Sequence, residues 1–202
     1  MPVVQLPNKK ILEITVSNKC GITTAISVMC YPLLGKHKAR GSSRELLQQN
    51  LWAKSLAYSI WQQPDYKICI VRDPVKRIAS CYADRVLIKN RENVKQEVYS
   101  WDIFLTNLAE WQDKYRDIRK HTYTQVSTIG KDPSIYDEIF TTEQLSTTFL
   151  DYMETISGVK IPPTIAKDSR NLKETFSVSD SHIDMIKEYY KEDYEYWGSY
   201  FQ

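Results

Sequence analysis

The fold of this 202-residue chain is set by the stretch Ile11-Leu12-Glu13-Ile14-Thr15-Val16-Ser17-Asn18-Lys19-Cys20-Gly21-Ile22-Thr23-Thr24. Its first six residues form a β-rich run, which predicts a strand over 11–16. A polar turn follows over 17–21, and the next residues predict a helix over 22–31 that Pro32 ends. The order strand, short turn, helix is the beginning of a β–α unit.

A second unit of the same kind occupies 66–82. Residues 66–71 are a nearly continuous apolar run, which is typical of a buried parallel strand. Asp73 is placed to cap the following helix and Pro74 to occupy its first position, and this helix is expected to reach toward Lys89. Strands that alternate with helices predict an α/β fold with a parallel sheet, and ligands in such folds bind near helix N-termini at the carboxyl ends of strands.

The rest of the chain fits a single domain over 1–202. Its hydrophobic fraction of 42% is ordinary for a globular protein. Gly158 is expected to end a helix. The further elements predicted are helices over 43–61, 101–111, 142–156 and 179–197, a strand over 136–140, and loops over 33–41 and 90–98.

Charge is unevenly distributed along a nearly neutral chain. Residues 1–91 hold 15 Lys and Arg against 5 Asp and Glu, and residues 92–202 hold 12 against 20. A basic half indicates a local anion site, with a solvated charge asymmetry as an equally weighted alternative. We expect no nucleic-acid partner, because the sequence has neither a recognition motif nor a dense basic tract.

Cysteine spacing and hydropathy point to a reducing compartment. The four cysteines include no CxxC pair, so we expect no metal site. No apolar run reaches the length of a membrane span, so we expect no stable membrane insertion and a cytoplasmic, bacterial-type soluble enzyme, with an anchor outside this sequence left open. Trp52, Trp61 and Trp101 are interpreted as packing residues rather than a sugar platform.

The turn over 17–24 has the parts that hold a phosphate or sulfate group. A turn that enters a helix offers free backbone N–H groups and the positive end of the dipole. Gly21 permits close approach, Thr23 and Thr24 supply hydroxyls, and Lys19 supplies a mobile charge. The Walker pattern is absent, because Lys19 precedes the glycine. The alternative is a loop with a chance lysine and ordinary capping threonines.

The turn over 72–82 offers a second anion site. Arg72 follows the strand, and Arg77 and Ser80 share a helix face. Arg72 and Ser80 could converge on a phosphate, since a planar guanidinium makes paired hydrogen bonds to an oxyanion. The alternative is a capped helix with a surface salt bridge between Asp73 and Arg77.

Together these two turns resemble the nucleotide-binding signatures of sulfotransferases that use 3′-phosphoadenosine 5′-phosphosulfate (PAPS), and the later segments are similar to carbohydrate sulfotransferases. Residues 18–24 resemble loosely the 5′-phosphosulfate loop P-K-x-G-[ST]-[ST]. Residues 72–82 match every specified position of the 3′-phosphate signature R-D-P-x-x-R-x-x-S-x-Y. Residues 121–125 with 136–140 look like an H-x-x-x-Q…Y-D-x-I segment, and residues 189–195 resemble a terminal Y-x-x-D-[FY]-E helix.

The resemblance implies a P-loop-like three-layer fold, with a central parallel β-sheet flanked by helices. It also implies transfer of a sulfuryl group from PAPS to an acceptor, with adenosine 3′,5′-bisphosphate as the co-product and no metal. Lys19 would stabilise charge on the bridging oxygen, and Arg72 and Ser80 would hold the 3′-phosphate. A late loop with Lys167 and Arg170 would close over the nucleotide or contact the acceptor, with a plain solvated loop as an equally weighted alternative. The nucleotide-binding residues expected are Lys19, Cys20, Gly21, Ile22, Thr23, Thr24, Arg72, Ser80, Lys167 and Arg170.

The acceptor must lose a proton as it attacks, so a general base is expected. His121 lies in a segment that resembles the family and is the first choice, with His37 next and His182 and Glu45 as further candidates. The acceptor is expected to be a hydroxyl of a carbohydrate, a glycolipid or another small molecule, and the oligomeric state stays open. The alternatives are a P-loop-like kinase that uses ATP and magnesium, and a non-catalytic nucleotide-binding protein on the same scaffold.

Overall fold

The computed structural model describes residues 3–35, 63–89, 94, 96–98, 100–163 and 176–201. The chain forms two compact units, one made of Met1–Val71 with Asp132–Ala166 and the other of Arg72–Lys131 with Lys167–Gln202. The first unit contains a sheet and the described part of the second is helical.

The elements of the first unit are β1 (Val3–Gln5), β2 (Ile11–Val16), α1 (Ile22–Leu34), β3 (Tyr66–Val71), the 3₁₀ helix η3 (Pro133–Ile135), β4 (Glu138–Thr141), the 3₁₀ helix η4 (Thr142–Ser146) and α8 (Thr148–Ser157). Those of the second unit are α3 (Pro74–Cys81), the π-helix η1 (Tyr82–Ile88), α4 (Trp101–Thr106), α5 (Leu108–Lys114), α6 (Arg116–Thr122), α7 (Val126–Ile129), α9 (Asp180–Tyr189), α10 (Lys191–Trp197) and the 3₁₀ helix η6 (Gly198–Tyr200).

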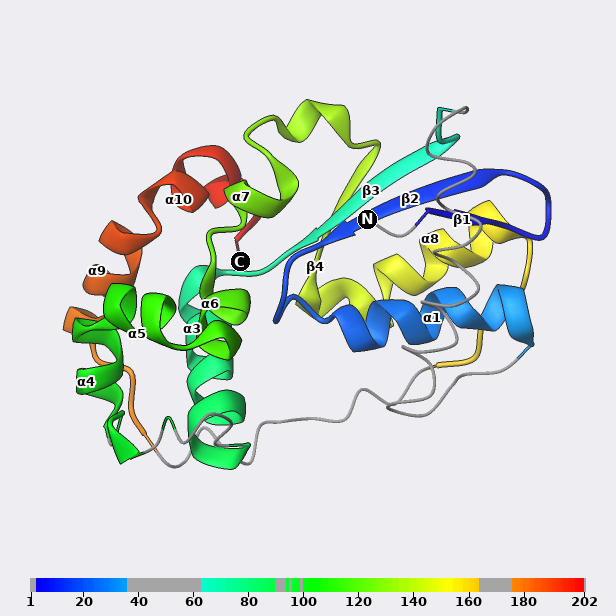
Figure 1. Ribbon diagram of the computed structural model, residues 1–202. Helices are drawn as coiled ribbons and strands as arrows, with labels where there is room; N and C mark the ends of the chain where they lie inside the picture. Colours follow the sequence, from blue (N-terminus) through cyan, green and yellow to red (C-terminus); the bar gives the residue numbers. More distant parts are fainter. Residues whose placement is uncertain are drawn as a thin grey trace. The chain divides into compact units, whose positions relative to one another are not determined.

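The sheet of the first unit has the strand order β1-β2-β3-β4. β3 pairs in parallel with β2 and with β4, whereas β1 pairs antiparallel with β2. Alternate residues of the central strands, such as Ile14, Ile68 and Ile70, join one buried cluster with side chains of α1 and α8. Figure 1 shows these two helices side by side along the sheet.

The α/β class is therefore confirmed, and the predicted parallel sheet is corrected by the antiparallel β1. This strand has only three residues, which is too short for a periodicity to be seen in the sequence. The P-loop-like, three-layer arrangement stays a prediction, and the helix predicted over 43–61 lies outside the described residues.

The two strands that frame the signature turns have the predicted bounds, 11–16 and 66–71. The strand predicted over 136–140 begins later, at Glu138. The prediction that Pro32 ends the first helix was wrong, because Pro32 lies inside α1. The helix ends at Gly35, which has φ 66° and donates its N–H to the carbonyl of Tyr31.

Several predicted helices are divided in the structure. The helix that begins at Pro74 continues beyond Cys81 as the π-helix η1. Breaks at Asn107, Thr147 and Tyr190 divide the segments predicted as 101–111, 142–156 and 179–197. Gly158 ends α8 in the left-handed conformation, as predicted. Apolar spacing continued across each break, so the sequence pattern did not reveal it.

The second unit is built around its own buried aromatic cluster. The ring of Tyr82 lies 5.2 Å from the rings of both Trp101 and Phe104. Tyr82 is the last specified residue of the 72–82 signature, so this signature is tied to the core of the unit. Trp101 is buried, as predicted, and Trp52 and Trp61 lie outside the described residues.

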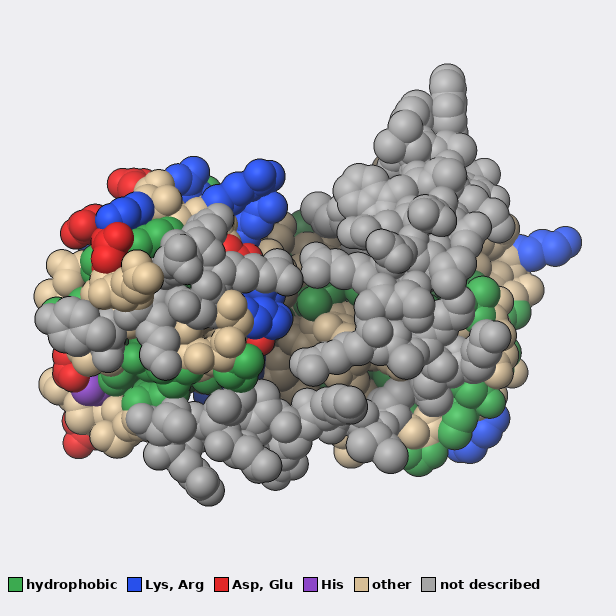
Figure 2. Space-filling model, turned by 60° about the horizontal axis from the view of Figure 1, so that its bottom comes forward, with side chains coloured by type: hydrophobic (Ala, Val, Ile, Leu, Met, Phe, Trp, Pro, Cys, Tyr) green, Lys and Arg blue, Asp and Glu red, His purple; other side chains and the backbone are tan. Residues whose placement is uncertain are grey.

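Charged side chains of both signs share the surface of the second unit. Lys131 pairs with Glu192 at 2.9 Å and Lys191 with Glu188 at 3.3 Å. In the view of Figure 2, Lys and Arg side chains of this unit lie beside Asp and Glu side chains. None of the helices in the described ranges has the length and hydropathy needed to cross a membrane.

Candidate functional site

The turn between β2 and α1 adopts a left-handed backbone at two positions. Lys19 has φ 67° and Gly21 has φ 70°. A non-glycine residue in this region costs about 1–2 kcal/mol and is uncommon, so the surrounding structure must hold Lys19 there. The N–H of Cys20 donates to the carbonyl of Ser17 at 3.2 Å, which closes the turn.

Glycine is the only residue type that fits at position 21 without a rearrangement of the neighbouring side chains. A Cβ atom placed on it would lie 2.3 Å from Cδ1 of Leu145, and Leu145 is itself buried in the core of the first unit. Its φ of 70° adds a backbone penalty for any L side chain. The requirement for glycine in the predicted phosphosulfate loop therefore has a packing cause as well as a conformational one.

The start of α1 is not capped by a side chain. Gly21 is the N-cap and has no side chain to cap the helix, and the first turn contains no acidic residue. The alternative of ordinary capping threonines is thus wrong, because Thr23 and Thr24 lie inside the helix. The N–H groups of Thr24 and Ala25 donate to the carbonyl of Gly21, at 2.9 and 3.0 Å, and the positive end of the dipole of this 13-residue helix favours an anion.

The start of α3 is organised in the opposite way. Asp73 is the N-cap, its Oδ1 accepts from the N–H of Lys76 at 3.1 Å, and Pro74 occupies the first position, all as predicted. Because a carboxylate already occupies this helix N-terminus, an anion near it must be bound by side chains. Arg72 and Ser80 are the two partly exposed side chains predicted for that role.

The proposed surface salt bridge between Asp73 and Arg77 is wrong. The side chain of Arg77 is only 1% exposed, and its Nη2 lies 3.9 Å from Oδ2 of Asp193. Its guanidinium also lies over the ring of Tyr190, 5.2 Å from the centroid. Arg77 is therefore a buried structural cation. Ser80, three residues later on the same helix, is partly exposed.

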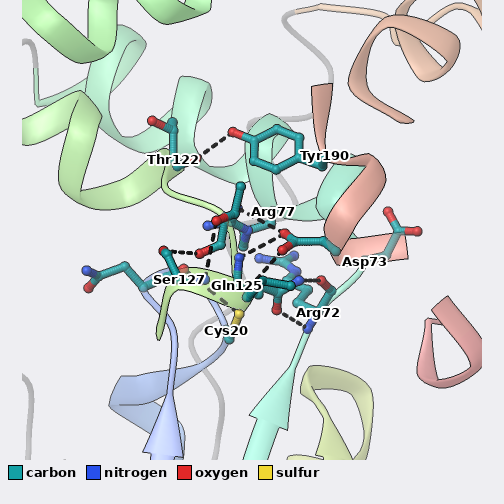
Figure 3. Close-up of polar contacts among 12 residues, drawn as sticks. Cys20, Arg72, Asp73, Arg77, Thr122, Gln125, Ser127 and Tyr190 are labelled. Atoms are coloured by element: carbon teal, nitrogen blue, oxygen red, sulfur yellow. Dashed lines mark hydrogen bonds and ion pairs between the residues drawn. The ribbon is translucent and has the colours of Figure 1, made fainter. Parts of the chain in front are cut away.

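Gln125 binds the backbone of Arg72 with both ends of its side-chain amide. The N–H of Arg72 donates to Oε1 of Gln125 at 3.0 Å, and Nε2 of Gln125 donates to the carbonyl of Arg72 at 2.8 Å. Figure 3 shows these contacts beside Arg77. Gln125 is completely buried, so water does not compete for these hydrogen bonds.

Asp193 holds the segment that carries Gln125. Its carboxylate accepts the backbone N–H groups of Gln125 and Val126, both at 2.9 Å. Burial raises the pKa of Asp193, while the two N–H donors and Arg77 oppose that shift. The buried carboxylate thus links α10, the start of α7 and α3.

Two tyrosines of the C-terminal helices complete this arrangement. The hydroxyl of Tyr190 donates to the carbonyl of Thr122 at 2.5 Å, and that of Tyr194 donates to Oδ2 of Asp73 at 3.3 Å. Burial is the main reason that the pKa of each tyrosine is raised, so both stay protonated and able to donate.

His121 lies on α6, which packs against α3 in the second unit. Its Nδ1 is 2.6 Å from the carbonyl oxygen of Asp117, so Nδ1 carries the proton and Nε2 is the basic nitrogen of the neutral ring.

In His182 both ring nitrogens make hydrogen bonds within the second unit. Its Nδ1 accepts from the N–H of Ser179 at 3.1 Å, and its Nε2 is 2.8 Å from Oδ1 of Asp102.

The predicted site residues divide between the two units. The structure places Lys19, Cys20, Gly21, Ile22, Thr23 and Thr24 together in the first unit, and Arg72, Ser80 and His121 in the second. The sulfur atom of Cys20 is buried with its residue, and Thr23 is exposed. His37, Glu45, Lys167 and Arg170 lie outside the described residues.

Sequence reasoning assigned no role to Gln125 or Asp193. Both occupy specified positions of the two later motifs, H-x-x-x-Q and Y-x-x-D-[FY]-E, so the signal was present. Their contacts join residues 53 and 68 positions apart, which no local pattern predicts.

A family model described as "Sulfotransferase family" matches residues 3–200, which is nearly the whole chain. The chain belongs to the sulfotransferase family. Searches of curated proteins and of solved structures gave no match. Membership in this family identifies the protein as a transferase of sulfuryl groups and does not favour the kinase alternative.

We predict that Gly21→Ala destabilises this sulfotransferase more than Gly158→Ala. Both glycines have φ 70°, but the space around Gly158 is open to 4 Å. Gly158→Ala should lower the free energy of unfolding by about 1–2 kcal/mol, and Gly21→Ala by about 1–3 kcal/mol more because of the collision with Leu145. Urea denaturation of the two variants measures the difference. Equal losses would show that the collision is relieved at no cost.

Proposed function

We propose that this sulfotransferase uses PAPS as the donor and transfers its sulfuryl group to a hydroxyl of a carbohydrate or glycolipid acceptor. The observation that carries the proposal is the complete 3′-phosphate signature over 72–82, whose first residue is fixed by Gln125 and whose helix is capped by Asp73. The family match over residues 3–200 supports sulfuryl transfer, and this signature supports the donor.

The turn of the first unit fits the 5′-phosphosulfate group. The start of α1 has no capping side chain and no acidic residue in its first turn, so its positive dipole end is suited to an anion. Thr23 and Thr24 would add hydroxyl donors from the first turn of the helix. Ile22 would contribute through its backbone, because its side chain is apolar. Cys20 would act by holding the shape of the loop, since its side chain is buried and its N–H donates to the carbonyl of Ser17.

The 3′-phosphate would be held by Arg72 and Ser80 of the second unit. A guanidinium binds a phosphate through paired, charge-assisted hydrogen bonds, and a serine hydroxyl adds a further donor. This pair would distinguish PAPS from nucleotides without a 3′-phosphate. We propose that residues 1–202 act as a single sulfotransferase domain.

Catalysis would consist mainly of positioning and electrostatic stabilisation, as in phosphoryl transfer. PAPS supplies, when bound, a sulfuryl group attached to a phosphate leaving group. The ammonium of Lys19 would meet the negative charge that develops on the bridging oxygen and would donate a proton to it. The described residues contain no cluster of His, Cys, Asp and Glu suited to a metal ion, and the proposal uses none.

His121 is our proposed general base. Its Nδ1 hydrogen bond to Asp117 fixes the tautomer with a basic Nε2, which is the form that accepts a proton from a hydroxyl. His182 does not suit this role, since both its nitrogens are engaged in the start of α9 and with Asp102. His37 remains the second candidate from the sequence.

The remaining sequence predictions stay part of the proposal. Lys167 and Arg170 would close over the nucleotide or contact the acceptor. All four cysteines are buried thiols that form no disulfide, which accords with the cytoplasmic location that we propose.

Arg72→Ala should abolish selectivity for the 3′-phosphate. We expect wild-type protein to bind adenosine 3′,5′-bisphosphate at least about tenfold more tightly than adenosine 5′-monophosphate, and Arg72→Ala to bind both equally, because one charge-assisted contact contributes about 1.5–3 kcal/mol. Calorimetric titration measures both affinities. Lys76→Ala, which removes a charge from the same signature at an unspecified position, is the control. A wild-type protein indifferent to the 3′-phosphate would refute the PAPS proposal.

Replacement of His121 should reduce turnover while nucleotide affinity is retained. His121→Ala is expected to lower kcat by roughly 10²–10⁴-fold, the usual contribution of a general base. His182→Ala should change stability through the start of α9 but leave kcat nearly unchanged. Release of adenosine 3′,5′-bisphosphate from PAPS with a panel of carbohydrate acceptors gives the rates. Similar kcat values for wild type and His121→Ala would exclude His121 as the base.

A further inference from the structure

We propose that Gln125 is a positioning residue for nucleotide recognition, because its side-chain amide fixes the backbone of Arg72 and thereby aims the Arg72 guanidinium at the 3′-phosphate. This inference rests on the proposed function and adds to it a residue outside both nucleotide signatures. Gln125 itself would not touch the nucleotide.

Gln125 contacts the backbone of Arg72 directly. Arg72 lies between β3 and α3, so neither element supplies the regular hydrogen bonds of its backbone. The amide of Gln125 binds both its N–H, at 3.0 Å, and its carbonyl, at 2.8 Å. A single side chain thus takes the place of a neighbouring strand at this residue, in a completely buried position.

Fixing the backbone of Arg72 also restricts where its guanidinium can lie. An arginine has several rotatable bonds, and its guanidinium is displaced strongly when the backbone at its root turns. The neighbouring residue is already fixed, because Asp73 binds the N–H of Lys76 and the hydroxyl of Tyr194. With Gln125 in place, the backbone is held on both sides of the Arg72 Cα atom. Paired hydrogen bonds to a phosphate need such an orientation.

Gln125 is itself held in position by a buried carboxylate. Asp193 accepts the backbone N–H groups of Gln125 and Val126, and Arg77 of α3 lies 3.9 Å from the same carboxylate. Through Gln125, the buried carboxylate of Asp193 connects α10 to the start of the 3′-phosphate signature. This connection explains why a glutamine and an aspartate stand at specified positions of the two later motifs.

A double-mutant cycle between Gln125 and Arg72 tests the proposal. Wild type, Gln125→Ala, Arg72→Ala and the double variant are titrated calorimetrically with adenosine 3′,5′-bisphosphate. Gln125→Ala should weaken binding by at least about fivefold in the wild-type background and by less than about twofold in the Arg72→Ala background, because its effect passes through Arg72. The affinity for adenosine 5′-monophosphate should stay within about twofold of wild type.

Asn107→Ala is the matched control. The side-chain amide of Asn107 also bonds to a backbone carbonyl of the second unit, that of Ile103 at 3.2 Å, and this acceptor lies outside the 72–82 signature. The Asn107→Ala variant should therefore bind adenosine 3′,5′-bisphosphate with unchanged affinity. If Gln125→Ala does not fold, Gln125→Asn, which keeps the amide and shortens its reach, replaces it in the same cycle.

The outcomes separate this inference from the function on which it rests. Equal losses of affinity in both backgrounds, or no loss in either, would overturn the positioning role while the selectivity of wild type for the bisphosphate would still stand. A wild-type protein without that selectivity would overturn the proposed function and the inference with it. A lowered melting temperature with unchanged affinities would show that Gln125 is merely structural.

Discussion

The buried carboxylate of Asp193 is the constraint on which the second unit depends. It accepts two backbone N–H groups where the chain enters α7 and faces the buried guanidinium of Arg77. Removal of one partner of such a pair leaves a buried charge without compensation, at a cost of about 3–5 kcal/mol. The same carboxylate keeps Gln125 beside the backbone of Arg72. A structural contact is thereby coupled to the residue that we propose binds the nucleotide.

The two units use their helix starts differently. α1 begins at Gly21 without a capping side chain, so its N–H groups and the positive end of its dipole are suited to an anion. α3 begins at Asp73, whose carboxylate occupies that place. The first motif is accordingly built on backbone groups and the second on side chains. The use of backbone groups in one motif and side chains in the other agrees with the residues that each motif specifies. The first motif specifies a glycine, and the second specifies an arginine and a serine.

Local chemistry made the strands and the signature turns predictable. The apolar run over 66–71, the cap Asp73 and the first-turn Pro74 all act within a few residues of one another, and the structure confirms them. Strand β1 pairs with the adjacent β2 but has only three residues, too few for a periodicity to show. The breaks at Asn107, Thr147 and Tyr190 interrupt segments whose apolar spacing is continuous, so periodicity did not predict them either. The same holds for the burial of Arg77, since its partner lies at the other end of the chain.

The central claim is that a nucleotide is recognised through a phosphate at its 3′ position. Adenosine 2′,5′-bisphosphate has the same atoms and charge as the 3′,5′ isomer, so a comparison of the two separates position from net charge. The measurement is the ratio of their dissociation constants for wild-type protein at one salt concentration. The account predicts at least about tenfold tighter binding of the 3′,5′ isomer, equivalent to about 1.4 kcal/mol. Equal affinities would mean that the signature over 72–82 attracts anions without reading the 3′-phosphate, and would contradict the account.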